Sequence, residues 1–150
     1  MRHHLESEIE IEAPPSIVWA ALTDLDSYRD WNPFVVSSEG TIAVGQKLRN
    51  RLQSPGGRAM TFRPRVTAVE PESTFEWLGR LGLPGLFDGR HRFELAATST
   101  GTRLTQTEDF SGLLVRLMRG SLDSQTHDGF EAMNAALKTR AEALAGAEAA

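Results

Sequence analysis

The strongest constraint on the fold of this chain is a long run of alternating segments that ends in one long helical pattern. Between residues 46 and 110, apolar and polar side chains alternate over several stretches separated by turn-forming residues. Such alternation is typical of β-strands with one buried and one solvent-facing side. From about residue 122 to residue 145 the spacing becomes helical, and Phe130, Met133 and Leu137 lie on one side of that helix. This order predicts antiparallel strands packed against a single C-terminal helix.

The first part of the chain predicts one strand followed by short helices. In residues 5–12, apolar side chains alternate with mostly acidic ones. Pro14 and Pro15 end this strand because proline has no N–H to donate to a sheet, and the same prolines favour the start of a helix. Residues 28–31 predict one more short helical turn before Asn32-Pro33.

The middle of the chain predicts five strands and several turns. Residues 60–69 predict one long strand, in which Pro64 marks a sheet edge or a bulge. The four residues Ser54 to Gly57 have the composition of a turn. The other predicted strands cover residues 46–52, 74–80, 90–95 and 102–110.

These elements predict an α+β fold, a curved antiparallel sheet wrapped around the long helix, formed by one domain over residues 1–150. A strongly curved sheet and a helix across its mouth need not fill the space between them, so an internal cavity is expected. The chain has no cysteine, which excludes disulfides and thiolate metal sites. We expect neither a metal nor a cofactor.

Charge and hydropathy limit the classes of partner. The formal net charge is −4, and lysine occurs only at Lys47 and Lys138, so a nucleic-acid partner is not expected. No apolar run approaches the roughly 20 residues that span a bilayer, so stable membrane insertion is not expected either. The N-terminal residues lack the apolar stretch of a signal peptide, and we expect a cytoplasmic protein.

Motifs spread over almost the whole chain resemble the START-like, or SRPBCC, superfamily, and within it the polyketide cyclase/dehydrase-type branch. The matching segments are Ile11 to Pro14, Val18-Trp19, Leu22 to Asp24, Tyr28 to Phe34, Gly89 to Phe93, Gly101 to Thr105, Glu108 to Gly112, Gly129-Phe130 and Met133 to Lys138. The resemblance implies the helix-grip fold, with short helices after the first strand. Similar proteins include carriers, cyclases and uncharacterised proteins, so the fold alone does not give the activity. We expect a small apolar or aromatic ligand of a lipid, polyketide or isoprenoid type.

On that fold, alternation decides which side chains face inward. Leu104 is a natural core position of its strand, so Gln106 and Glu108 face the same side, and His91 likewise faces inward beside Leu95. The predicted chamber has apolar walls and a few polar groups, and it is formed by Trp31, Phe34, Asn50, Met60, Phe62, Trp77, His91, Phe93, Gln106, Glu108, Phe130 and Asn134.

The inward polar side chains have two explanations. They form a satisfied internal network, with His91 bonded to Glu108, or they orient the oxygen atoms of a ligand, and both can hold together. The leading hypothesis is therefore binding of a small hydrophobic molecule. One alternative is a cyclase or dehydratase that uses His91 and Glu108 as acid and base. Another is a protein-interaction module with an incidental cavity. A metal site of His91, His127 and Glu108 has no support from spacing.

Three leucines in a glycine-containing segment allow a lid. Leu81, Leu83 and Leu86 either fold over the cavity mouth or pack as ordinary core beneath a loop. Gly82 and Gly85 would supply the hinge of such a lid.

Overall fold

The computed structural model describes residues 2–53 and 56–149, and the elements follow the predicted order. The α+β fold and the long C-terminal helix are confirmed. The elements are β1 (Arg2–Ile11), α1 (Pro15–Thr23), a 3-10 turn (Leu25–Ser27), α2 (Tyr28–Trp31), β2 (Val35–Glu39), β3 (Arg49–Gln53), β4 (Ala59–Phe62), β5 (Arg65–Glu70), β6 (Thr74–Leu81), β7 (Phe87–Ala97), β8 (Thr102–Ser111), α3 (Val115–Ser121), a π-helical segment (Leu122–Thr126) and α4 (His127–Ala149).

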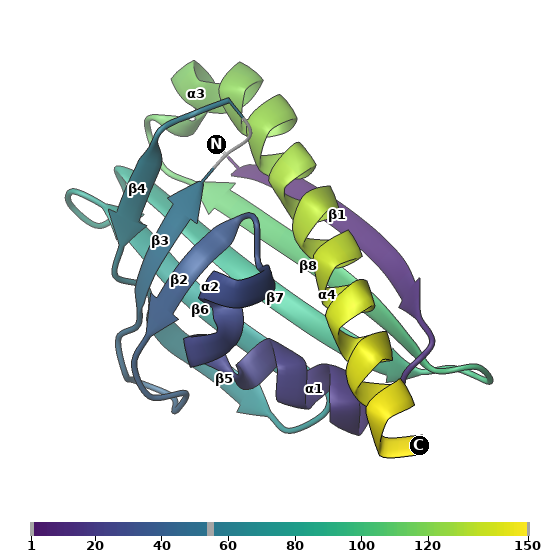
Figure 1. The fold of residues 1–150 in the computed structure, drawn as a ribbon. Helices are drawn as coiled ribbons and strands as arrows, with labels where there is room; N and C mark the ends of the chain where they lie inside the picture. The colour runs from purple at the N-terminus through teal and green to yellow at the C-terminus, as the bar shows by residue number, and fades with distance from the viewer. Residues whose placement is uncertain (1, 54–55, 150) are drawn as a thin grey trace.

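The strands form two antiparallel sheets. The larger sheet has five strands in the order β1-β8-β7-β6-β5, and the smaller one has the order β2-β3-β4. The backbone N–H of Leu48 donates to the Pro64 carbonyl at 2.8 Å, and that of Val66 donates to Gln46 at 2.8 Å, so the two sheets meet along β5. Figure 1 shows α4 lying across the concave side of the larger sheet, with the smaller sheet beside it.

The predicted strand over residues 60–69 is wrong, because the chain changes sheet at Pro64. Residues 59–62 pair with β3, whereas residues 65–70 pair with β6. Pro64 lies between these strands, where its missing N–H interrupts no ladder. Of the predicted turn at residues 54–57, Ser54 and Pro55 lie outside the described residues.

The C-terminal helix begins later and ends later than predicted. Residues 122–126 have π-helical hydrogen bonding, and the regular α-helix runs for 23 residues to Ala149. The alanine-rich end has high helix propensity, and α4 continues through residues 145–149. No helix among the described residues is long and apolar enough to cross a membrane.

A glycine in the first turn of α4 allows the helix to approach the start of the smaller sheet. Gly129 lies against the ring of Phe34, and a Cβ built there would be 2.3 Å from a ring carbon. Phe34 is held in this position because the Asn32 side-chain oxygen accepts hydrogen bonds from the N–H groups of Phe34 and Val35 at 3.0 and 2.9 Å. The ring of Phe34 also meets that of Phe130 edge to face.

Replacement of Gly129 by alanine tests this contact. Alanine normally stabilises a helix interior relative to glycine by about 0.5–1 kcal/mol. At residue 129 we expect a loss of about 1–3 kcal/mol in the free energy of unfolding instead, because the methyl group would overlap the Phe34 ring. Urea unfolding measures the change. Gly146→Ala is the matched control, since it lies in the same helix with nothing within 4 Å of the added carbon, and it should be neutral or stabilising. Equal effects at the two positions would contradict the close approach.

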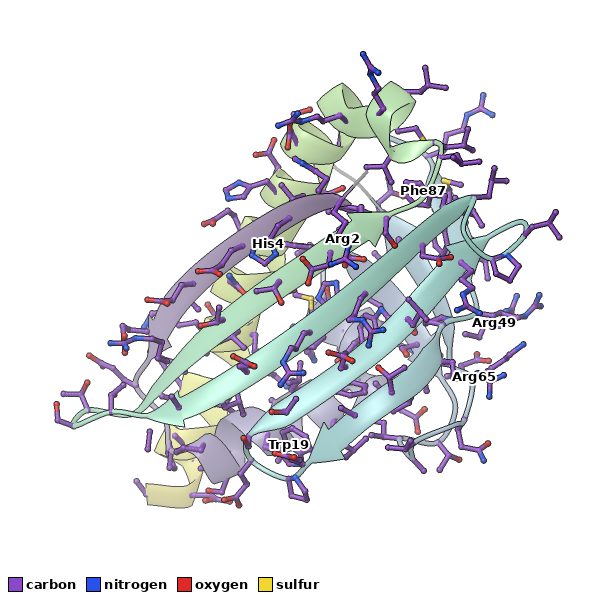
Figure 2. All side chains as sticks on the ribbon, turned by 180° about the vertical axis from the view of Figure 1, so that it is seen from behind. Arg2, His4, Trp19, Arg49, Arg65 and Phe87 are labelled. Carbon is purple, nitrogen blue, oxygen red and sulfur yellow. The ribbon has the colours of Figure 1, made fainter. Side chains whose placement is uncertain are left out.

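The other face of the larger sheet carries a buried carboxylate. Figure 2 shows this face from behind, with no helix in front of the strands. Glu76 of β6 is only 7% exposed, and it accepts hydrogen bonds from Arg90 at 2.7 Å, Arg92 at 2.9 Å and Thr67 at 2.8 Å. Burial would raise the pKa of Glu76, but the hydrogen bonds from Thr67, Arg92 and Arg90 outweigh it and lower that pKa below its ordinary value.

The lowered pKa of Glu76 makes the stability of the fold depend on pH. The contribution is fully present above the ordinary glutamate pKa of about 4.3 and is lost as the pH falls through the lowered folded-state pKa. We expect Glu76→Gln to cost about 1–2 kcal/mol at pH 7, since both arginines are partly exposed, and to flatten the acid limb of the stability curve. Thermal unfolding between pH 7 and pH 3 measures this. Glu94→Gln removes an exposed partner of the same Arg92, and a similar flattening in that variant would argue against Glu76 as the origin.

Candidate functional site

A cavity of about 220 Å³ lies between the two sheets and the start of α4. Its walls are mainly aromatic and aliphatic, and they come from β3, β4, β6, β7, β8 and the helical segments around residues 118–130. The cavity reaches the surface near Met60, which is half exposed. It lies toward the α3 end of the molecule, where Figure 2 labels Phe87, and away from the end marked by Trp19.

Eight of the twelve predicted site residues line this cavity. They come from both sheets and from α4, and they are Phe34, Asn50, Met60, Phe62, Trp77, His91, Glu108 and Phe130. Contact of these side chains with a ligand stays a prediction.

The other four predicted residues do not line the cavity. Trp31 packs edge to face on Tyr28, and its ring nitrogen donates to Ser27, so its side chain is part of the α2 turn. Phe93, Gln106 and Asn134 face inward as predicted, but they are buried behind the wall. The alternating pattern of a strand predicts which side of the sheet a residue faces. It does not predict where along the strand the helix packs against the sheet.

The polar centre of the cavity wall is a pair of facing residues on neighbouring strands. His91 of β7 is the direct cross-strand partner of Glu108 of β8. Because cross-strand partners project to the same side of a sheet, their side chains meet, and His91 Nδ1 lies 2.5 Å from Glu108 Oε2. Both are buried, with side-chain exposures of 4% and 12%. The predicted pairing of these two residues is therefore present in the structure.

His91 also uses its second ring nitrogen. Nε2 lies 2.9 Å from the Oε1 atom of Gln106, two residues before Glu108 on the same face of β8. The Gln106 amide nitrogen donates to Asn134 Oδ1 at 2.6 Å, and the Asn134 amide nitrogen donates to Ser7 Oγ at 3.0 Å. Ser7 is the cross-strand partner of Gln106 on β1, which explains why the network crosses to that strand.

Aromatic rings enclose the imidazole of His91. Its ring stacks on Trp77 at a centroid distance of 4.9 Å and an interplanar angle of 22°. Phe93 lies 4.6 Å away on the same strand, and Phe130 of α4 meets the ring edge on at 4.9 Å. These contacts, together with the two hydrogen bonds, hold the imidazole in one orientation and leave neither nitrogen free for a ligand.

Two buried residues of the cavity wall each keep a polar atom without a hydrogen-bond partner in the described part of the chain. The second oxygen of Glu108, Oε1, has no hydrogen bond to the described residues and lies where a Cβ on Gly89 would be 2.5 Å away. Asn50 accepts a hydrogen bond from Ser38 at 2.6 Å, which leaves its amide nitrogen unpaired within the described part of the chain. The buried part of the wall thus offers one carboxyl oxygen and one amide NH₂ group among apolar side chains, and the exposed Gln125 and half-buried Thr126 also line the cavity.

The outer rim of the cavity includes residues that the sequence pattern does not predict. Arg58 and Arg80 both line it and are exposed, and Arg80 lies 3.4 Å from Asp88. Alternation predicts buried positions, so it gives no signal for a long side chain that reaches a cavity mouth from the surface.

The leucines of residues 81–86 do not all form a lid, and they do not all pack as core. Leu81 belongs to β6 and lines the cavity, whereas Leu83 is 76% exposed and is not core. The backbone of Gly85 and Leu86 accepts hydrogen bonds from Leu113 and Leu114, which ties this hairpin to the start of α3. Movement of the hairpin as a lid stays a prediction.

Within the described residues, no group of three or more histidine, aspartate or glutamate side chains is arranged to hold a metal ion. His127 lies on α4 beside Glu131, at 3.7 Å, rather than beside His91.

Residues 2–142 match the model of the family described as polyketide cyclase / dehydrase and lipid transport. The chain belongs to this family. The resemblance inferred from the motifs is therefore confirmed. No protein with a curated description matches the chain.

Solved structures of similar fold include aromatase/cyclases. The Zhui aromatase/cyclase from Streptomyces sp. R1128 has a TM-score of 0.78 at 20% identity, with 95% of this chain and 94% of that chain covered. The di-domain ARO/CYC StfQ from the steffimycin biosynthetic pathway has a TM-score of 0.78 at 16% identity, over 97% of this chain and 52% of StfQ. Protein MLL2253 from Mesorhizobium loti has a TM-score of 0.70 at 24% identity, over 93% and 97% of the two chains. At these identities the likeness shows the helix-grip fold alone.

Gly89 provides a test of the Glu108 position. In Gly89→Ala the added methyl group would be 2.5 Å from Oε1, so we expect the carboxyl group to turn away from His91. Loss of that buried hydrogen bond should cost about 1–3 kcal/mol of unfolding free energy. A crystal structure of the variant and its urea unfolding measure both effects.

Gly79→Ala is the matched control for this substitution. Gly79 is the cross-strand partner of Gly89 and also lines the cavity, but its nearest neighbour would be 3.8 Å from the new carbon. We expect an intact His91–Glu108 contact and a change within about 0.5 kcal/mol. An unmoved Glu108 carboxyl group in Gly89→Ala would contradict the described packing.

Proposed function

We propose that the protein binds a small, mainly apolar molecule that carries a hydroxyl or carbonyl oxygen at its inner end. The observation that carries this proposal is the pair of unpaired polar atoms, Glu108 Oε1 and the Asn50 amide nitrogen, among the buried and mainly apolar side chains of the cavity wall. A hydrogen bond contributes about 0.5–1.5 kcal/mol net, so a ligand oxygen that bonds to these atoms would be favoured over a purely apolar ligand. The family description, which includes lipid transport, supports the same class of ligand.

The size and the rim of the cavity narrow the ligand further. A volume of about 220 Å³ lies below the roughly 300–1,000 Å³ of common ligand pockets, which favours a compact molecule or one whose outer end protrudes. Arg58 and Arg80 at the rim would bind an acidic group on such a protruding end. The proposed ligand therefore has an apolar body, an inner oxygen and, where it extends to the mouth, an anionic outer group.

The first experiment is native mass spectrometry of the purified protein, followed by denaturing extraction. We expect a small apolar molecule bound to one site, and its identification would name the chemistry of the ligand. Isothermal titration calorimetry with 2-naphthol and with naphthalene then tests the inner polar atoms. We expect 2-naphthol to bind more tightly, because only its hydroxyl group can bond to Glu108 or Asn50.

The variant Asn50→Leu separates the polar contact from simple burial. We expect about tenfold weaker binding of 2-naphthol, which corresponds to one lost hydrogen bond, and unchanged binding of naphthalene. Equal loss for both compounds would point to a damaged cavity. Tight naphthol binding by the variant, or no binding of either compound by the wild type together with an empty extract, would contradict the proposal.

A second candidate function is a cyclase or dehydratase-type reaction on the same class of ligand. The geometry favours Glu108 over His91 as the group that exchanges a proton with a substrate, because both nitrogens of His91 are already hydrogen-bonded. In a dehydration, a base would remove the proton next to a carbonyl and an acid would protonate the departing hydroxyl, which leaves as water. An enzyme should lose turnover in Glu108→Gln with binding largely kept, whereas a carrier should only change affinity.

A further inference from the structure

The hydrogen bonds of the cavity wall continue to the molecular surface as one unbranched chain. It runs from Glu108 on β8 to His91 on β7, back to Gln106 on β8, to Asn134 on α4, to Ser7 on β1, and ends at Glu131 on α4. Glu131 and Asn134 are one helical turn apart, so both face β1. The chain thus joins a buried carboxyl group to one that is 56% exposed.

At the outer end of this series of hydrogen bonds, it is fixed which group donates and which accepts. Glu131 is exposed, and its carboxylate offers hydrogen-bond acceptors and no donor. The Ser7 hydroxyl donates to it in a short hydrogen bond. The single hydroxyl proton of Ser7 is then used, and Ser7 Oγ can only accept a bond from its other neighbour, Asn134.

The side-chain amides of Asn134 and Gln106 continue the same order of donor and acceptor toward the cavity. Asn134 must present its NH₂ group to Ser7, so its carbonyl oxygen faces Gln106. Gln106 must therefore present its NH₂ group to Asn134, and its own carbonyl oxygen faces His91 Nε2 at 2.9 Å. If either amide were turned over, two acceptors or two donors would face each other in a buried site.

At the inner end, His91 has only one compatible tautomer. Nε2 must carry hydrogen, because it faces a carbonyl oxygen. The contact of 2.5 Å between Nδ1 and Glu108 Oε2 then needs one proton, held by the imidazole or by the carboxyl group. The Nδ1–H tautomer with a bare Nε2 is excluded, since that nitrogen and the Gln106 oxygen would both be acceptors.

We propose that Glu131 is a positioning residue that acts through Ser7, Asn134 and Gln106 to fix His91 as an Nε2–H donor. The proton shared by His91 and Glu108 is thereby kept on the cavity side of the ring. Glu108 Oε1 becomes the atom at which the site exchanges a proton or a hydrogen bond with a ligand hydroxyl or carbonyl. The tautomer holds without any ligand, whereas the ligand step rests on the proposed function.

The test is ¹⁵N NMR of the histidine side chains in the ligand-free protein at pH 7. The signals of His91 are identified as those missing from His91→Gln. In the wild type we expect Nε2 to be fully protonated. In Glu131→Gln, the new amide can donate or accept, so the direction is no longer imposed, and the His91 Nε2 signal should shift toward the unprotonated range. Glu142→Gln, on the same helix but bonded to Lys138 and to the Glu12 N–H, should leave His91 unchanged.

Two results for the wild type and for variants of Glu131 and Ser7 would overturn the proposal. One is an unprotonated His91 Nε2 in the wild type, and the other is an unchanged His91 spectrum in Glu131→Gln and in Ser7→Ala, which removes the same link from the strand side. Thermal unfolding of each variant shows that the fold is kept. His127 lies 3.7 Å from Glu131, so His127→Gln shows whether that neighbour alone moves the signal. A shift in His127→Gln as large as that in Glu131→Gln would also overturn it.

Binding of 2-naphthol to the same variants separates this proposal from the proposed function. If the wild type binds 2-naphthol and both Glu131→Gln and Ser7→Ala leave the His91 spectrum unchanged, the positioning role fails and ligand binding stands. If the spectrum shifts as expected and 2-naphthol does not bind, the positioning role stands and the proposed ligand class fails.

Discussion

The site depends on how closely α4 can approach the smaller sheet. Gly129 allows the Phe34 ring to lie directly on the helix backbone, and Asn32 holds the preceding turn so that the ring stays there. Beyond this contact the concave face is wider than one helix, and β3 and β4 close part of the remaining space. The cavity is therefore the volume that one helix and two sheets of this curvature leave unfilled. Figure 1 shows the same arrangement, with the helix diagonal to the strands that it covers.

The polar side chains that face this space are mostly satisfied by one another. His91 uses both nitrogens, and Gln106 and Asn134 pass their hydrogen bonds on to Ser7. A complete network of this kind stabilises a buried site and needs no ligand. It nevertheless leaves Glu108 Oε1 and the amide nitrogen of Asn50 at the cavity wall without partners in the described chain. The internal network thus accounts for most of the inward polar atoms, and orientation of a ligand remains a proposal for the other two.

The sequence predicts the order of the elements and the inward faces of the strands well, because both follow from periodicity. The pairing of His91 with Glu108 follows from the same rule once the two strands are neighbours. Periodicity could not reveal that the chain changes sheet at Pro64, since an alternating pattern continues through it.

The sequence also could not predict which residues border the cavity. Phe93 shares the inward face of β7 with His91, and Asn134 lies on α4 near Phe130, yet both are buried away from the cavity wall where the helix packs on the sheet. Arg58 precedes β4 and Arg80 belongs to β6, and both are exposed residues that nevertheless line the cavity. Side-chain reach and helix placement are properties of the assembled structure, and no local pattern encodes them.

A carboxyl group that faces an aromatic cavity would be costly to keep ionised without a partner. His91 removes most of that cost, because the proton between Nδ1 and Oε2 makes the pair neutral overall wherever that proton lies. The pair is therefore stable in an empty cavity, and its presence alone does not show catalysis. It does place a proton donor and acceptor at a fixed point in apolar surroundings, where a ligand oxygen would meet little competition from water. A carrier uses this point to select ligands with an oxygen at the inner end, and an enzyme needs one further property, that the proton leaves Glu108 during the reaction.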